Sequence, residues 1–146
     1  MISKYDSLKL ENQLCFPIYL CSKEIIRKYT PFLKDVDLTY TQYIVMLYFF
    51  EKGTSNVKSL GNTLLLDSST LTPLLRKLEA KEYLKITKSK YDERNLSISL
   101  TKKGEELKNK LLDIPKKIGE CINLSEDEAK TLYSLMYKIL LNIEKE

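Results

Sequence analysis

The residues of this chain best suited to redox chemistry are its three cysteines, Cys15, Cys21 and Cys121. The chain has no histidine, and no two cysteines have the Cys-x-x-Cys spacing, so a zinc site would lack its usual ligands. So few cysteines, so far apart, do not form the framework of a disulfide-stabilised fold. We therefore expect free thiols, with no metal and no cofactor.

Cys15 lies on an apolar stripe with helical spacing that continues through Ile18, Ile25 and Tyr29. On the residues alone, burial in the core is the more common role of such a free cysteine. The alternative is a reactive thiol, which attacks as the thiolate. Cys21 follows six residues later, a rise of about 9 Å on a helix, whereas a disulfide tolerates a Cα separation of about 7 Å. An intact helix therefore excludes a disulfide between Cys15 and Cys21.

The elements that position these thiols follow from composition and hydrophobic periodicity. With 146 residues and 43% apolar content, the chain is expected to fold as a single domain around one core. Charged residues interrupt the first twenty positions, and no run of eighteen apolar residues occurs. The sequence therefore predicts a cytoplasmic protein with neither a signal peptide nor a membrane span.

The N-terminal part of the chain predicts one long helix, from Leu8 to about Tyr29. Pro17 falls inside this helix and has no backbone amide hydrogen to donate. We therefore expect a bend two residues from Cys15. Pro31 and the residues that follow it are expected to mark the end of the helix.

The middle of the chain has the pattern of a helix-turn-helix motif. A capping box at residues 39–42 opens a helix that ends near residue 53, and two shorter helices follow at about 57–65 and 68–81. The last of these starts with small polar side chains that could reach base edges, and its later basic residues could hold phosphates. A surface helix with ordinary caps is the alternative. The candidate DNA contacts on this helix are Asp67, Ser68, Ser69, Thr70, Thr72, Arg76 and Lys77.

A predicted hairpin follows the helix-turn-helix, with strands near residues 83–86 and 95–100. Between Arg76 and Lys103, nine basic residues stand against four acidic ones, a net charge of +5 in a chain whose total is +4. A positive patch beside a neutral body is typical of a phosphate-binding surface, although a solvated charged face is the simpler alternative. The predicted fold is mainly α with a small β-wing, a winged helix-turn-helix. The candidate DNA contacts in the wing are Lys88, Lys90, Asp92 and Arg94, with Arg94 suited to an A·T-rich minor groove.

The C-terminal part predicts two more helices. Thr101 caps the first, which should reach about Asn123 with a kink at Pro115, and a capping box at residues 125–128 opens the second. Their apolar stripes, with that of the first helix, exceed what a small winged domain needs to cover itself. We therefore expect a homodimer, although a satellite helical core within one subunit is an alternative. Within the single domain 1–146, about 8–30 and 101–146 would dimerise and about 39–100 would bind DNA.

Four motifs, which follow one another along the chain in the same order as in a known family, resemble the motifs of that family. The wing sequence Asp92-Glu93-Arg94, followed by Ser97 to Gly104, resembles the signature of the MarR family of winged-helix regulators. Gln13-Leu14-Cys15-Phe16, Leu38-Thr39-Tyr40 and the run from Leu66 to Leu75 are similar to the OhrR branch of peroxide-sensing repressors and related thiol-based regulators. The resemblance covers about residues 10–141. It implies a homodimeric repressor that binds a palindromic operator in double-stranded DNA and releases it when an organic hydroperoxide oxidises the protein.

The resemblance also implies roles for single residues. Cys15 stands at the sensor position, and hydroxyls of Tyr29 and Tyr40 from the partner subunit would hold its thiolate, with Tyr19 close by. Cys121 stands where two-cysteine members carry a resolving cysteine, and a small cellular thiol would take that part if Cys121 cannot reach Cys15. Two residues depart from the family pattern, Pro17 and Ser69, and the operator sequence therefore cannot be transferred.

Two other functions remain open on the sequence. A regulator of this fold could respond to a small aromatic ligand bound near the tyrosines instead of to oxidation. A thiol peroxidase could use Cys15 and Cys121. However, the chain lacks the Pro-x-x-x-Thr-x-x-Cys pattern of peroxiredoxins, and its basic residues gather on a helix and a wing. The sequence therefore favours a regulator that is not an enzyme.

Overall fold

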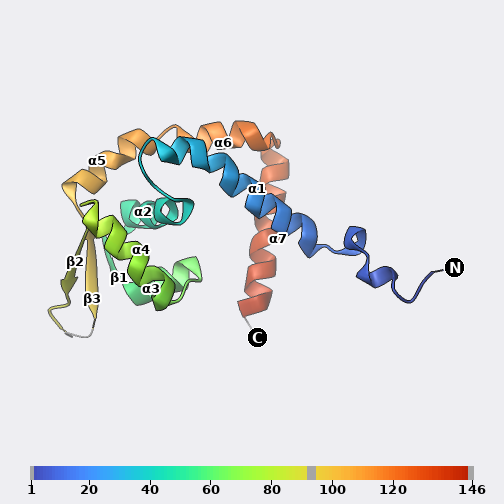
Figure 1. The fold of residues 1–146 in the computed structure, drawn as a ribbon, viewed down its shortest axis with the longest axis horizontal. Coiled ribbons are helices and arrows are strands. Elements are labelled where there is room, and N and C mark those ends of the chain that lie inside the picture. The colour runs from blue at the N-terminus through green and yellow to red at the C-terminus, as the bar shows by residue number, and fades with distance from the viewer. Residues whose placement is uncertain (1, 92–94, 145–146) are drawn as a thin grey trace. The chain divides into compact units, whose positions relative to one another are not determined.

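The computed structural model describes residues 2–91 and 95–144. These residues form a mostly helical fold with one small sheet (Figure 1). The chain divides into two compact units, Met1–Ile114 and Pro115–Glu146. Two 3-10 turns, η1 (Asp6–Leu8) and η2 (Leu10–Asn12), precede α1 (Cys15–Lys34), α2 (Tyr40–Lys52), β1 (Thr54–Asn56), α3 (Val57–Leu64), α4 (Ser68–Ala80), β2 (Leu84–Lys88), β3 (Leu96–Leu100), α5 (Lys102–Leu111), α6 (Ile114–Ile122) and α7 (Glu126–Glu144).

The three strands form an antiparallel sheet in the order β1-β3-β2. Ile98 at the centre of β3 pairs with Ser55 of β1 and Ile86 of β2, and it is fully buried. The predicted hairpin is therefore confirmed as β2 and β3. β1 was not predicted from the sequence, because a strand of three polar residues carries no period-two signal.

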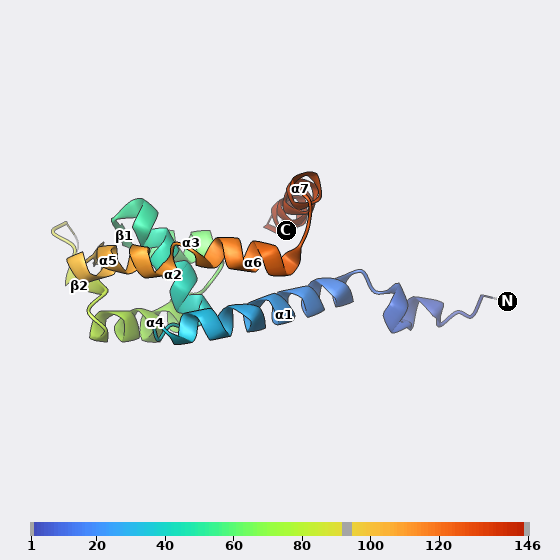
Figure 2. The same ribbon diagram turned by 90° about the horizontal axis from the view of Figure 1, so that it is seen from above.

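The core of the first unit is built around α2. This helix lies between α1 and α5 (Figure 2), and its Val45, Met46 and Phe49 are fully buried. A capping box starts the helix as expected, since the Thr39 hydroxyl accepts from the Gln42 amide and the Gln42 side chain accepts from the Thr39 amide. The other elements close over α2 with buried residues that include Leu60, Leu71, Leu78, Leu84 and Leu107.

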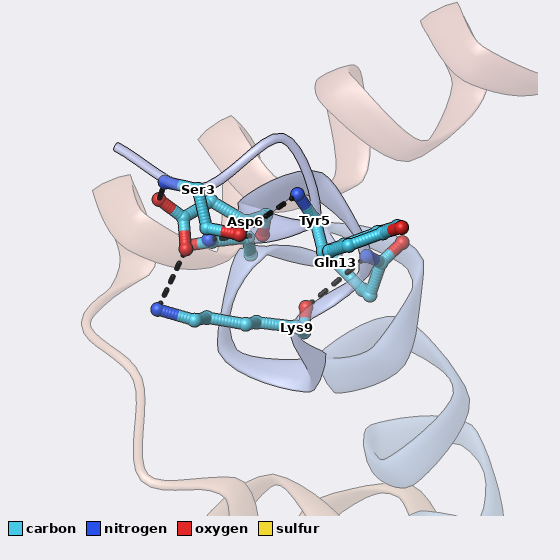
Figure 3. Close-up of polar contacts among 6 residues, drawn as sticks. Ser3, Tyr5, Asp6, Lys9 and Gln13 are labelled. Atoms are coloured by element: carbon cyan, nitrogen blue, oxygen red, sulfur yellow. Dashed lines mark hydrogen bonds and ion pairs between the residues drawn. The ribbon is translucent and has the colours of Figure 1, made fainter. Parts of the chain in front are cut away.

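The predicted start of the first helix at Leu8 is wrong, because α1 begins at Cys15. The preceding residues fold into η1 and η2, held by local side-chain bonds (Figure 3). The Gln13 amide donates to the carbonyls of Ser7 at 2.6 Å and Lys9 at 3.1 Å, and the Lys9 ammonium lies 2.7 Å from the Asp6 carboxylate. These bonds compete with a continuous helix for the same backbone groups.

The prolines of the long helices act differently from expectation. Pro17 is the third residue of α1, in the first turn, where backbone amides have no acceptor within the helix and proline causes no bend. Pro31 does not end α1, which continues to Lys34. Pro115 is the second residue of a new helix, so the helix predicted from Thr101 to Asn123 is divided into α5 and α6.

Close packing joins the start of α5 to the sheet. The Thr101 hydroxyl accepts from the Gly104 amide and donates to the Glu82 carbonyl at 2.6 Å, which confirms Thr101 as the cap. A Cβ on Gly104 would lie 2.3 Å from the Tyr83 carbonyl oxygen. Glycine at this position therefore allows the base of the wing and α5 to pack without a gap.

Candidate DNA-binding interface and thiol site

A tight turn connects the two helices of the helix-turn-helix motif. Leu65 ends α3 in the left-handed conformation with φ 53°, and Asp67 caps α4. The Asp67 carboxylate accepts from the Ser69 hydroxyl at 2.6 Å and from the Thr70 amide at 2.8 Å. These bonds, first that of Ser69, lower the pKa of Asp67. The Asp67 carboxylate therefore fixes the start of the helix, whose first turn carries the other candidate contacts.

The two faces of α4 differ in polarity. Leu71, Leu75 and Leu78 are buried against the core, and the four hydroxyl residues of the first turns are exposed. These exposed residues are Ser68, Ser69, Thr70 and Thr72. The structure thus leaves the predicted base-reading side chains exposed on the first turns of α4.

Glu79 links α4 to the wing. One carboxylate oxygen lies 3.3 Å from the Arg76 guanidinium, and the other accepts from the Ile86 amide of β2 at 3.0 Å. Arg76 and Lys77 are both exposed. The hydrogen bond between the Ile86 amide and the Glu79 carboxylate is charge-assisted, and it supports the orientation of α4 relative to β2.

The hairpin of β2 and β3 projects basic side chains. Lys88 and Lys90 are exposed, and the Ser89 amide donates to the Asn95 carbonyl at 2.8 Å across the hairpin. The remaining predicted wing contacts, Asp92 and Arg94, lie outside the described residues. Lys88 and Lys90 can contact phosphates, and such contacts do not depend on the base sequence.

All three cysteines are free and exposed. Cys15 is the first residue of α1, so the core role that its pattern suggested is wrong. Helix N-termini attract negative charge, and a thiolate is negatively charged. Cys15 belongs to the first unit and Cys121 to the second.

A cluster of three tyrosines forms where α1 meets α2. The ring centroids are 4.8 Å apart for Tyr29 and Tyr40, 5.5 Å for Tyr29 and Tyr43, and 6.2 Å for Tyr40 and Tyr43. Tyr43 was missed from the sequence, although its spacing of three from Tyr40 places both on one helix face. Tyr19 lies apart from this tyrosine cluster and is exposed on α1.

Within one subunit, Cys15 cannot reach the tyrosine cluster. Tyr29 follows Cys15 by fourteen positions on the same helix, a rise of about 21 Å. Tyr19 lies one turn from Cys15, and the Lys23 ammonium is 5.9 Å from its ring centre. A role for Tyr29 and Tyr40 in holding the sulfur therefore requires that they come from a partner subunit.

Burial keeps the clustered phenols protonated. It raises the pKa of Tyr29 and Tyr40, with a further contribution from Tyr40 for Tyr29, and it raises the pKa of Tyr43 to about 12. A tyrosine with the usual pKa of about 10 is already protonated at neutral pH, and these raised values extend the range in which the hydroxyl groups can donate hydrogen bonds.

An alkaline titration is expected to separate Tyr43 from an unfolded tyrosine. Because its folded pKa is raised above about 10, the usual value, its contribution to stability is fully present below pH 10. This contribution is lost as the pH rises towards 12. Absorbance titration of tyrosinate in native protein should show a late transition that Tyr43→Phe removes. A native titration that matches the urea-unfolded chain would contradict this packing.

The described residues hold neither a metal-binding cluster nor a membrane-spanning helix. Across residues 2–91 and 95–144, no cluster of three or more cysteine, aspartate or glutamate side chains could hold a metal ion. Within the same ranges, no helix combines the length and the apolar character of a membrane span.

An exposed polar helix in a helix-turn-helix, followed by a basic β-hairpin, defines a winged-helix DNA-binding protein. Residues 27–111 match the family model of the transcriptional regulator SarA/Rot. The HTH-type transcriptional regulator SarZ of Staphylococcus aureus (strain MRSA252) is 51% identical over 123 residues, which cover 84% of this chain and 83% of SarZ. The chain therefore belongs to the SarA/Rot family of transcriptional regulators.

Solved structures of AbfR show the same fold. AbfR of Staphylococcus epidermidis has 32% identity and a TM-score of 0.80, with 98% of this chain and 99% of that chain covered. Reduced AbfR bound to DNA has 33% identity and a TM-score of 0.80, covering 97% and 99%. Disulfide-formed AbfR has 31% identity and a TM-score of 0.66, covering 98% and 97%.

The family resemblance inferred from the motifs is confirmed at the level of fold. MarR from E. coli shares the fold at 24% identity and a TM-score of 0.64, over 88% of this chain and 96% of MarR. The winged-helix prediction and the assignment to DNA-binding transcriptional regulators, which are not enzymes, are therefore confirmed.

Proposed function

We propose that this protein is a homodimeric repressor that releases its operator when Cys15 is oxidised. The observation that carries the proposal is the exposure of Cys15 at the N-terminus of α1. A reactive thiol must be accessible to its oxidant, and a helix N-terminus favours negative charge on sulfur. AbfR, which resembles this chain over almost its whole length, has been solved both reduced on DNA and with a disulfide formed.

The proposed oxidant is an organic hydroperoxide. The Cys15 thiolate attacks the distal oxygen, a sulfur–oxygen bond forms and the oxygen–oxygen bond breaks. The alkoxide leaves with two electrons and takes up a proton to become an alcohol, while sulfur becomes a sulfenic acid. Hydroxyl groups of Tyr29 and Tyr40 from the partner subunit would hold the thiolate before attack, and Tyr19 lies on the same helix as Cys15.

A second thiol then condenses with the sulfenic acid, so that a disulfide forms and water leaves. We propose Cys121 of the partner subunit as this thiol, with a small cellular thiol as the other route. Cys121 is exposed and free, as this step requires. A non-reducing gel of oxidised protein should show a covalent dimer, and monomer alone would contradict the Cys121 route.

We propose that a second copy of the chain covers the terminal helices. The apolar side chains of α7 are largely exposed, including Leu132, Leu135, Ile139, Leu140 and Ile143. A surface so apolar on a single subunit favours self-association. The dimer would present two copies of α4 to half-sites spaced by about 10 to 10.5 base pairs, or a multiple of this spacing.

The proposed DNA contacts fall into two sets. Ser68, Ser69, Thr70 and Thr72, followed by Arg76 and Lys77, would enter the major groove, with Asp67 fixing the helix start. Lys88 and Lys90 would contact phosphates, and Arg94, oriented by Asp92, would enter the minor groove.

The test is a titration of fluorescent DNA from upstream of the gene with reduced protein. It is repeated after about one equivalent of organic hydroperoxide per subunit and again after a thiol reductant. We expect tight binding, then loss by about 5- to 150-fold, the usual range of allosteric coupling, and then recovery. Binding that ignores hydroperoxide would overturn the thiol switch and favour a regulator that responds to a small aromatic ligand.

A further inference from the structure

The turn between α1 and α2 contacts Lys81, at the C-terminal end of α4. In this turn the Asp37 amide donates to the Lys34 carbonyl at 3.1 Å, and the Leu38 amide donates to the Leu33 carbonyl at 3.0 Å. Asp37 has φ 51°, a left-handed conformation that non-glycine residues seldom adopt. Its carbonyl group accepts a hydrogen bond from the ammonium of Lys81.

Lys81 is the residue that caps the C-terminus of α4. Besides the Asp37 carbonyl, its ammonium lies 3.3 Å from the Asp37 carboxylate and 3.4 Å from the Gln42 side-chain oxygen. Gln42 is only 4% exposed, and the same oxygen accepts from the Thr39 amide in the capping box of α2. Lys81 therefore connects the C-terminal end of α4, the proposed recognition helix, to the backbone of the turn and to the first turn of α2.

This Lys81 contact lies beside the tyrosine cluster. Tyr29 stands before the turn on α1, and Tyr40 is the first residue of α2 after it. A movement of α2 relative to α1 at these tyrosines would therefore also move the turn that carries Asp37. A helix is stiff over the 13 residues of α4, so a shift at Lys81 is transmitted to Ser68 and Thr70 at the other end.

The surroundings of Lys81 leave room for such a shift. The contact borders a hollow of about 280 Å³, whose lining includes Thr30 and Lys34 of α1 together with Leu38. The Lys81 side chain is 27% exposed, so its ammonium can exchange these partners for water. Lys34 adds a second positive charge to the lining of the hollow.

We propose that Lys81 is the positioning residue that couples the tyrosine cluster to the recognition helix. This inference rests on the proposed function, because it states how oxidation at Cys15 would reach the DNA contacts. In the reduced protein Lys81 holds α4 in its binding orientation. A displacement of the turn by the oxidised dimer withdraws the Asp37 carbonyl and releases the helix end.

The test compares Kd for operator DNA in the oxidised and reduced states, together with the melting temperature. We expect Lys81→Met to lower the ratio of the two Kd values from about 5- to 150-fold to about onefold. Lys81→Arg should restore much of the ratio. Lys130→Met is the matched control, because Lys130 also pairs with a carboxylate, that of Glu126, but within a single helix.

A purely structural role would lower the melting temperature and weaken DNA binding equally in both states, leaving the ratio unchanged, and that result would overturn the inference. If Lys81→Met does not fold, Asp37→Asn tests the same contact and should reduce the ratio partly. A wild-type ratio of one would instead overturn the proposed function, which separates the two failures.

Discussion

The Cys15→Ser protein is expected to bind operator DNA as tightly as the reduced wild type and to keep that affinity after hydroperoxide treatment. Serine preserves the size and exposure of the side chain but cannot form a sulfenic acid, so the first step of the switch is lost. The wild type should lose about 1–3 kcal/mol of binding free energy under the same treatment. Fluorescence anisotropy with and without oxidant measures both values.

The other two cysteines provide the controls for this experiment. Cys21 is also exposed on α1, but helical geometry excludes a disulfide between it and Cys15 of the same subunit, and the proposed partner thiol is Cys121, so Cys21→Ser should respond like the wild type. Cys121→Ser should still be oxidised at Cys15 but form no covalent dimer. Release of DNA from Cys15→Ser by hydroperoxide would show that the sensor lies elsewhere.

Phe49→Ala is expected to destabilise the protein more than a surface change of similar size. Phe49 is fully buried in α2, with its ring 5.2 Å from that of Tyr48. Truncation of a buried phenylalanine costs about 3–5 kcal/mol, a large share of the roughly 5–15 kcal/mol typical of a folded domain. Urea unfolding measures the loss, and DNA binding should fall with it.

Tyr91→Ala is the matched control for Phe49→Ala. Tyr91 is 98% exposed on the wing, so its removal should change the free energy of unfolding by less than about 0.5 kcal/mol. Equal destabilisation by the two substitutions would contradict the packing of α2 as the centre of the core.

Local signals predicted the helix starts well. Thr39, Asp67, Thr101 and Ser125 all act as caps, because each accepts from an amide three residues later in the chain. Such bonds depend on neighbouring residues alone, which makes them readable from sequence. The start of α1 was harder to predict, because the amphipathic pattern before Cys15 fits a continuous helix as well as the two 3-10 turns that form there.

Features that depend on distant contacts were not readable from sequence. β1 is defined by its pairing with β3, more than forty residues away, as in the pair of Thr54 with Ser99. The Lys81 contact joins residues 44 positions apart, and nothing in the pattern around Lys81 indicates its partner. The exposure of Cys15 was also hidden, because an apolar stripe does not show which of its residues a subunit covers by itself.

The most direct test of the thiol switch follows DNA release and the state of Cys15 in the same samples. Hydroperoxide is added in substoichiometric steps, the bound fraction of DNA is read by anisotropy, and mass spectrometry gives the fraction of Cys15 still present as thiol. We predict that DNA release rises in step with Cys15 oxidation and is complete near one equivalent per subunit. Complete oxidation of Cys15 with DNA still bound, or release while Cys15 remains a thiol, would contradict the account.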